Sequence, residues 1–220
     1  MSFSAFSAPA KTQVLDADTK LVLRSISQRY KKLKSWKATF TQENFSTGLG
    51  TGTFNEGRFD FVAPNKFRYS IMRPESSDFI SNGKEAWQVV FNKGRDKPAF
   101  VRHISKLNKI DLERYLLVLR GIDAESPEKE AQLTKDFTLK GNFIGQDLSL
   151  EMIPKKSSEI SKVVLIFKNA IEAPYRAVIE DAVGGKTTIT IVSFDSLSPD
   201  KVDEKTFRPE YPKGSEVEEL

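Results

Sequence analysis

The sequence predicts a mainly β protein of the α+β class, with an antiparallel sheet and a small number of helices. Along most of the chain, apolar residues alternate with polar ones, which is the period of a strand with one buried face. Turn-forming residues separate these runs at regular intervals and delimit roughly ten strands. Helical periodicity is confined to the N-terminal segment and the middle of the chain, and it does not alternate with strands as in βαβ units.

The first predicted element is a helix within residues 14–34. Val22 and Ile26 belong to a set of apolar residues with the 3.6-residue period of a one-sided helix, and Asp16 can cap its first turn. Residues 1–13 are predicted to be flexible. Their small side chains suit the end of an export signal, which predicts a secreted protein whose signal peptide has been removed.

After this helix the period of the pattern changes to two. Trp36, Ala38 and Phe40 alternate with polar residues and predict a strand with one apolar face. The glycine-rich residues 48–52 are similar to a phosphate-binding loop, but no helical pattern follows, so a hairpin connection is predicted. Further strands with bulky groups on one face are predicted around Phe59 and Phe61, around Phe67, Tyr69 and Ile71, and around Trp87 and Val89.

The middle of the chain, residues 106–133, is predicted to be helical. Ser126 and Pro127 suit the N-cap and first position of a short helix. Before them, apolar residues at positions i, i+3, i+4 and i+7 form one face of an amphipathic helix: Leu112, Tyr115, Leu116 and Leu119.

The second half of the chain returns to the two-residue period. Turn residues separate the apolar runs, so the antiparallel meander is expected to continue to the C-terminal region. The runs lie at residues 137–139, 148–152, 163–167, 177–179 and 187–194.

Charge and hydropathy exclude two classes of partner. The chain has 34 Lys and Arg against 30 Asp and Glu, a net charge of +4, spread along the whole sequence. A nucleic-acid-binding protein would concentrate its basic residues on one element, so no nucleic acid partner is expected. No stretch approaches the roughly 18 consecutive apolar residues that span a bilayer as a helix.

The chain also lacks the residues that most hydrolases and zinc sites need. It has no cysteine and a single histidine, His103, so we assign no catalytic residue, metal ligand or cofactor and expect no enzyme. Carboxylates are plentiful. Asp78, Glu85, Asp147 and Glu180 could meet in space, which leaves a hydrolase as an alternative.

Four stretches in order along most of the chain carry a family resemblance. They are SWKATFTQ at residues 35–42, the segment 57–72 with Pro64 and Asn65, the turn at 81–87, and the C-terminal segment 202–217. Together they resemble the outer-membrane lipoprotein carrier (LolA) family.

The resemblance implies one LolA-like domain over residues 1–220, with a curved antiparallel sheet of about eleven strands. This sheet forms an open half-barrel covered by a lid of short helices. The implied function is that of a monomeric periplasmic carrier, which takes the acyl chains of lipoproteins into a hydrophobic cavity. It would receive them from an inner-membrane ABC transporter and pass them to an outer-membrane receptor. That receptor is anchored through a lipidated cysteine, so the absence of cysteine favours the carrier.

The apolar stripes supply the candidate binding residues, and burying acyl chains against them is favourable at about 0.8 kcal/mol per methylene. The inner face of the lid would carry Leu112, Tyr115, Leu116 and Leu119. The concave face of the sheet would carry Trp36, Phe40, Phe59, Phe61, Phe67, Tyr69, Ile71, Trp87 and Val89. A filled core predicts the same alternation, so the pattern does not show whether these side chains face a cavity.

One position departs from the family pattern. Well-known members carry an arginine before the proline of the second motif and use it to hold the lid closed, whereas this chain has Ala63 before Pro64. Either Arg68 or Arg58 takes over this role, or the empty lid is looser.

Other functions remain open for the same fold. The chain could carry a free lipid or glycolipid, or it could be a regulator that senses lipoproteins. A structural envelope protein with a filled sheet core is a further alternative.

Overall fold

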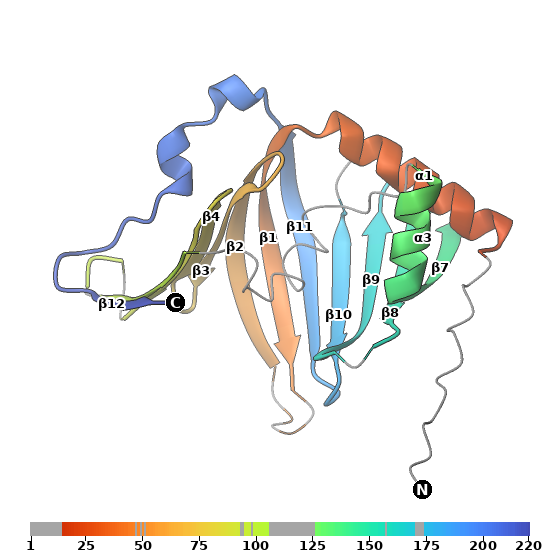
Figure 1. Ribbon diagram of the computed structural model, residues 1–220. Helices are drawn as coiled ribbons and strands as arrows, with labels where there is room; N and C mark the ends of the chain where they lie inside the picture. Colours follow the sequence, from red (N-terminus) through yellow and green to blue (C-terminus); the bar gives the residue numbers. More distant parts are fainter. Residues whose placement is uncertain are drawn as a thin grey trace, which may run out of the picture.

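In the part of the chain that the structure describes, twelve strands form one open sheet (Figure 1). This computed structural model describes residues 15–46, 48, 50, 52–92, 95–97, 99–105, 126–156, 158–169 and 174–220. The strands are β1 (Ser35–Phe45), β2 (Gly52–Val62), β3 (Lys66–Arg73), β4 (Ser77–Asn82), β5 (Ala86–Phe91), β6 (Ala99–Ile104), β7 (Phe137–Ile144), β8 (Asp147–Pro154), β9 (Ile160–Phe167), β10 (Arg176–Asp181), β11 (Lys186–Ser196) and β12 (Glu216–Glu219).

The strand order is β12-β6-β5-β4-β3-β2-β1-β11-β10-β9-β8-β7, so the N-terminal half of the meander meets the C-terminal half where β1 pairs with β11. The predicted fold class is confirmed, but the strand count is twelve rather than eleven. The additional strand is β12, which pairs with β6 in parallel, whereas the other pairs are antiparallel. Its acidic sequence has no apolar alternation, which is why strand patterning did not predict it.

The predicted N-terminal helix is present as α1 (Ala17–Lys32). Asp16 caps it: the Thr19 backbone N–H and hydroxyl donate to the two oxygens of its carboxylate, at 2.7 and 3.0 Å. These hydrogen bonds hold the pKa of Asp16 below its ordinary value. Val22 and Ile26 are fully buried, because α1 lies across β7 and β8 (Figure 1).

Gly141 on β7 allows the close approach of this helix. A Cβ atom there would lie 2.8 Å from the Thr19 Cα and 2.9 Å from the Val22 Cβ. The Gly141 N–H also donates to the Thr19 hydroxyl at 2.9 Å. The helix is therefore fixed to the sheet by both packing and a hydrogen bond.

The second helix in the described residues is α3 (Pro127–Asp136), as the Ser126-Pro127 pattern predicts. The Ser126 hydroxyl accepts a hydrogen bond from the Lys129 backbone N–H at 3.3 Å. The remainder of the predicted helical region, residues 106–125 with all four proposed lid residues, lies outside the described residues, as does segment 1–13. In the described part of the chain, neither helix is long and apolar enough to cross a membrane.

The strand register defines two faces of the sheet. Residues paired across neighbouring antiparallel strands place their side chains on the same face. Tyr69 pairs with Phe79, Phe79 with Gln88, and Gln88 with Arg102. We call the face with these side chains the inner face, and Gly141 under α1 lies on it as well.

The outer face of β3 and β4 is covered by the C-terminal segment. This segment contains two short 3-10 helices, η2 (Pro199–Lys201) and η3 (Glu204–Phe207), and η3 packs on both strands (Figure 1). The Phe207 side chain is almost completely buried there. The sheet therefore has apolar packing on both faces in this half of the molecule.

Candidate functional site

A cavity of about 920 Å³ opens on the inner face of the sheet. Its apolar lining consists of Tyr69, Ile71, Phe79, Ile104, Ile179, Ile189 and Leu220. Its polar lining includes Gln42, Asn44, Ser77, Asp78, Gln88, Arg102, Asp181 and Thr187. These residues come from both halves of the meander, so folding of the whole sheet is needed to form the site.

The cavity lies toward the far ends of β1 and β3, away from the connection between α1 and the sheet. Trp36, at the start of β1, is in the core that also contains α1 side chains, and it packs on Phe59 and Phe194 with ring centroids 4.7 and 5.4 Å apart. Gln42 and Asn44, near the end of the same strand, line the cavity instead. One strand thus passes from a filled core into an open space.

The structure places the sequence-predicted residues in three environments. Tyr69 and Ile71 line the cavity. Trp87 and Val89 lie on the outer face, in or against a separate small core. The remaining residues lie on the inner face, are buried in the large core and are not part of the lining: Trp36, Phe40, Phe59, Phe61 and Phe67.

Register explains the position of Trp87 and Val89. The inner-face residue of β5 is Gln88, because it pairs with Phe79, and successive side chains of a strand point to opposite faces. The outer face of this half of the sheet is also packed, since η3 and Arg95 lie against it. Apolar alternation therefore does not indicate the cavity side here, and we leave Trp87 and Val89 out of the proposed binding surface.

The boundary between the filled core and the cavity is an aromatic pair. The rings of Phe40 and Tyr69 stack with centroids 4.7 Å apart and an interplanar angle of 21°. Phe40 lies across Gly57 of β2, where a side chain would occupy the position of the ring. Phe40 is almost fully buried, and Tyr69 presents the adjoining surface to the cavity.

A network of neutral polar side chains continues from this pair along the cavity. The Tyr69 hydroxyl donates to the Gln42 side-chain oxygen, and the Gln42 amide nitrogen donates to Asn44 Oδ1 at 2.8 Å. The Thr187 hydroxyl also donates to Asn44 Oδ1, at 3.0 Å. The sequence did contain a signal for these residues, since Gln42 and Asn44 continue the two-residue period of Trp36, Ala38 and Phe40.

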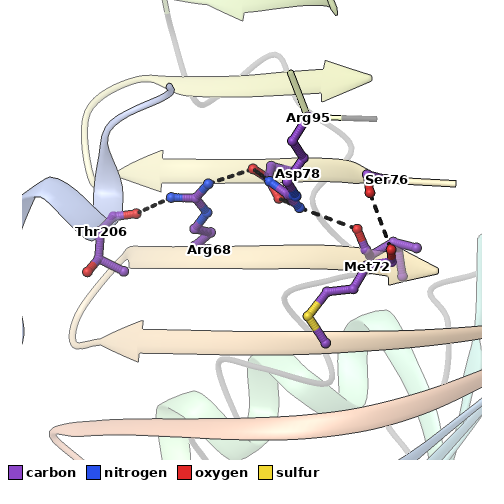
Figure 2. A network of polar contacts seen from close by, with 7 residues as sticks. Arg68, Met72, Ser76, Asp78, Arg95 and Thr206 are labelled. Atoms are coloured by element: carbon purple, nitrogen blue, oxygen red, sulfur yellow. Dashed lines mark hydrogen bonds and ion pairs between the residues drawn. The ribbon is translucent and has the colours of Figure 1, made fainter. Parts of the chain in front are cut away.

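Behind the cavity, a buried ion-pair cluster joins β3, β4 and the β5–β6 connection (Figure 2). The Asp78 carboxylate, whose side chain is fully buried, accepts from Arg68 at 2.6 Å and from both terminal nitrogens of Arg95 at 2.8 Å. Figure 2 shows Arg68 also reaching the Thr206 carbonyl of η3. Burial alone would raise the pKa of Asp78, but the hydrogen bonds from Arg95 and Ser70 and the charge of Arg68 outweigh it and lower the pKa.

Arg68 and Arg58 are the two candidates to replace the lid-holding arginine, whose position in this chain is occupied by Ala63. Arg68 is engaged with Asp78, and Arg58 donates to Asp60 at 2.7 Å. Arg58 pairs with Ser70, next to Tyr69, so both arginines lie on the outer face. Neither guanidinium group is placed to hold a lid over the inner face.

The four carboxylates considered for a hydrolase lie on separate parts of the sheet. Asp78 is engaged by two arginines, and Glu180 pairs with Lys162 at 3.0 Å. Asp147 accepts from the Asn169 backbone N–H at 3.3 Å, and Glu85 lies 3.9 Å from the His103 ring. Within the described ranges, no group of three or more His, Asp or Glu side chains is placed to hold a metal ion.

Comparison with known proteins gives a family match in the N-terminal half. The family model described as outer membrane lipoprotein carrier protein LolA matches residues 31–93. These residues extend from the end of α1 to the β5–β6 connection and include Gln42, Asn44, Tyr69, Ile71 and Phe79 of the cavity lining. The outer-membrane lipoprotein carrier protein of Erwinia tasmaniensis is 38% identical over 63 residues, which are 28% of this chain and 30% of that protein. The match thus spans less than a third of this relative's length.

A solved structure extends the likeness beyond that segment at the level of the fold. A crystal structure of MucB covers 89% of this chain and 64% of its own, with a TM-score of 0.51 and 13% identity. A LolA superfamily protein from Nitrosomonas europaea covers 88% and 99%, with a TM-score of 0.43 and 13% identity. The lipoprotein LppX of Mycobacterium tuberculosis covers 84% and 98%, with a TM-score of 0.47 and 12% identity.

The sequence matches and the observed fold agree with each other. The matched segment forms five consecutive strands of an open sheet, and the MucB likeness shows that this fold occurs in a solved structure. The chain is similar to the LolA family over residues 31–93, and its open sheet is similar to that of MucB.

Proposed function

We propose that the chain is a periplasmic carrier that binds the acyl chains of lipoproteins in the inner-face cavity. It would receive them from an inner-membrane ABC transporter and release them to an outer-membrane receptor. The observation that carries this proposal is a cavity of about 920 Å³ with a partly apolar lining, in a sheet whose N-terminal half matches the LolA family.

The size of the cavity supports an acyl ligand. Water's share of liquid volume is about 30 Å³, so the cavity has room for about 30 groups of that size, which is enough for one or two long hydrocarbon chains. Burial stabilises each methylene by about 0.8 kcal/mol, and ten methylenes therefore contribute about 8 kcal/mol. Apolar attraction is non-directional, so such a cavity tolerates chains of different length.

A charged side chain introduced into the apolar part of the cavity wall tests this function. Ile71 and Met72 are neighbours on β3; Ile71 lines the cavity, whereas Met72 is 44% exposed and outside the lining. We expect Ile71→Glu to weaken binding of a fluorescent fatty-acyl probe about 30-fold, because a carboxylate next to hydrocarbon costs about 2 kcal/mol. Met72→Glu is the matched control and should bind the probe like the unaltered protein.

Probe titration followed by fluorescence distinguishes the outcomes. Equal affinities of both variants would show that the probe binds elsewhere, and failure of the unaltered protein to bind any acyl probe would refute the proposal. Far-UV circular dichroism of each variant confirms that the sheet is intact.

A carrier of free lipid or glycolipid is the second candidate. It is favoured by the polar part of the lining, since Gln42, Asn44 and Thr187 suit a ligand that has hydrogen-bonding groups beside its hydrocarbon. Mass spectrometry of material extracted from the purified protein separates the two candidates, because it identifies either a lipid or a lipoprotein.

A further inference from the structure

The cavity contains a built polar site on one wall. We call Gln42, Asn44 and Thr187 the polar belt. They lie at the junction of the two halves of the sheet, where Asn44 pairs with Thr187 and Gln42 pairs with Ile189. Ile179 and Ile189 beside them are apolar members of the same lining. The belt thus forms one polar strip next to hydrocarbon-binding surface.

Hydrogen bonds inside the belt fix the two amide groups. Gln42 Oε1 accepts from the Tyr69 hydroxyl, and Asn44 Oδ1 accepts from both Gln42 and Thr187. Asn44 Nδ2 donates to the Thr53 hydroxyl at 3.2 Å. Since the amide oxygens are already used as acceptors, the orientation of both amides is determined by their neighbours.

This arrangement leaves hydrogen-bond donors for a ligand. Each side-chain amide has two N–H donors. Among the described residues, one donor of Gln42 is engaged by Asn44 and one donor of Asn44 by Thr53. The second N–H of each amide makes no hydrogen bond to the described residues, and both side chains line the cavity, so the belt could donate two hydrogen bonds to an acceptor group.

The charged residues of the lining are already compensated by the protein. Arg102 pairs with Glu218 at 2.9 Å, and Asp78 is engaged by two arginines. The Asp181 carboxylate accepts the backbone N–H groups of Val183 and Gly185 at 2.9 and 2.7 Å. A neutral acceptor is therefore a better partner for this wall than an ionised headgroup.

We propose that the polar belt binds the neutral carbonyl linkage, ester or amide, that joins acyl chains to the rest of the ligand. This inference rests on the proposed acyl-binding function. It adds that the linkage is held at one position along the cavity wall, which sets how far the acyl chains enter. Hydrocarbon fills the apolar lining, and the linkage carbonyls accept from Gln42 and Asn44. Acyl groups of a lipoprotein and of a free glycerolipid share this chemistry.

Two ligands that differ only in their carbonyl groups test the belt. We would measure the dissociation constants of 1,2-dioctanoylglycerol and of its ether analogue, 1,2-di-O-octylglycerol, by displacement of a bound fluorescent acyl probe. Two hydrogen bonds of about 1 kcal/mol each are expected to give the diester an affinity at least tenfold higher. Gln42→Met and Asn44→Leu should each reduce this preference several-fold and leave the affinity for the diether within about twofold.

Controls keep the two proposals separable. Asn142→Leu, at an exposed position of β7 outside the lining, should retain the full preference for the diester. Thr187→Val removes the hydroxyl that donates to Asn44 Oδ1 with little change in shape, so it should also reduce the preference. It replaces either amide variant that fails to fold. Equal affinity for diester and diether overturns the belt alone, whereas failure of both ligands to bind overturns the carrier function as well.

The same variants test whether the belt recognises the linkage itself, whatever molecule carries it. A diacylated lipopeptide and a free diglyceride with equal chains are both expected to lose affinity to the same extent in Gln42→Met, because the belt contacts only the linkage. Unchanged affinity for both ligands in this variant contradicts the inference.

Discussion

Asp78→Ala is expected to lower the free energy of unfolding by about 3 kcal/mol. The substitution removes the carboxylate that pairs with both Arg68 and Arg95 and takes this partner from two cations. The expected cost is at the lower end of the range for a broken buried ion pair, because the Arg95 side chain is 40% exposed and can rehydrate. Urea denaturation monitored by circular dichroism measures the change.

The control for this prediction is Asp96→Ala in the same β5–β6 connection. The Asp96 side chain is 76% exposed and lies 3.5 Å from Lys97, so its removal should change the unfolding free energy by less than about 0.5 kcal/mol. A similarly small loss for Asp78→Ala would show that the cluster does not stabilise the fold. A large loss would show that the wall carrying Tyr69, Ile71 and Phe79 is held in place from its outer side.

The same cluster predicts a dependence on pH. The pKa of Asp78 is lower in the folded protein than its ordinary value, so the charged carboxylate stabilises the fold. This contribution is complete above the unfolded-state pKa, about 3.9, and is lost as the pH falls through the lower folded-state pKa. The difference in stability between the unaltered protein and Asp78→Asn should therefore shrink from pH 5 toward pH 2.

Gly57→Ala is expected to destabilise the protein by about 3 kcal/mol, at the upper end of the cost of overpacking a core. An added Cβ would lie 2.6 Å from the Ser70 carbonyl oxygen and closer still to the ring of Phe40. The ring is buried and stacked on Tyr69, so moving it would break this packing. Backbone shifts in β2 and β3 would then disturb the edge of the cavity, so weaker acyl-probe binding is expected along with the lower stability.

Gly48→Ala, in the connection between β1 and β2, provides the comparison. No atom lies within 4 Å of a Cβ built at this position, and its backbone conformation is open to other residues. Its unfolding free energy should stay within about 0.5 kcal/mol of that of the unaltered protein. Equal stabilities of the two glycine variants would contradict the close packing of Phe40 over β2.

The fold could be predicted from sequence because its determinants are local. Strand period, turn residues and the α1 stripe with its Asp16 cap each occupy a few consecutive residues, and each indicates the same class. The parallel strand β12 could not be predicted in this way. It is held by edge pairing and by contacts such as Glu218 with Arg102, which depend on residues over 100 positions apart.

The site could be predicted only in part, because it depends on the register of the strands. Trp36 and Tyr69 follow the same apolar period and both belong to the core shared with α1, yet only Tyr69 also borders the cavity. What separates them is their place in the folded sheet, which no strand pattern contains. Gln42 and Asn44, at the end of the aromatic strand, are polar, so the apolar stripe did not indicate them as part of the lining.

Paramagnetic broadening of isoleucine methyl signals by a spin-labelled fatty acid tests most directly whether the inner-face cavity binds acyl chains. Methyl NMR should show broadening of Ile71, Ile179 and Ile189, which line the cavity. Ile144 and Ile153, which are 59% and 39% exposed and lie outside the lining, should remain sharp. Broadening of this exposed pair with sharp signals from the cavity residues, or no broadening at all, would contradict the cavity as the acyl-binding site.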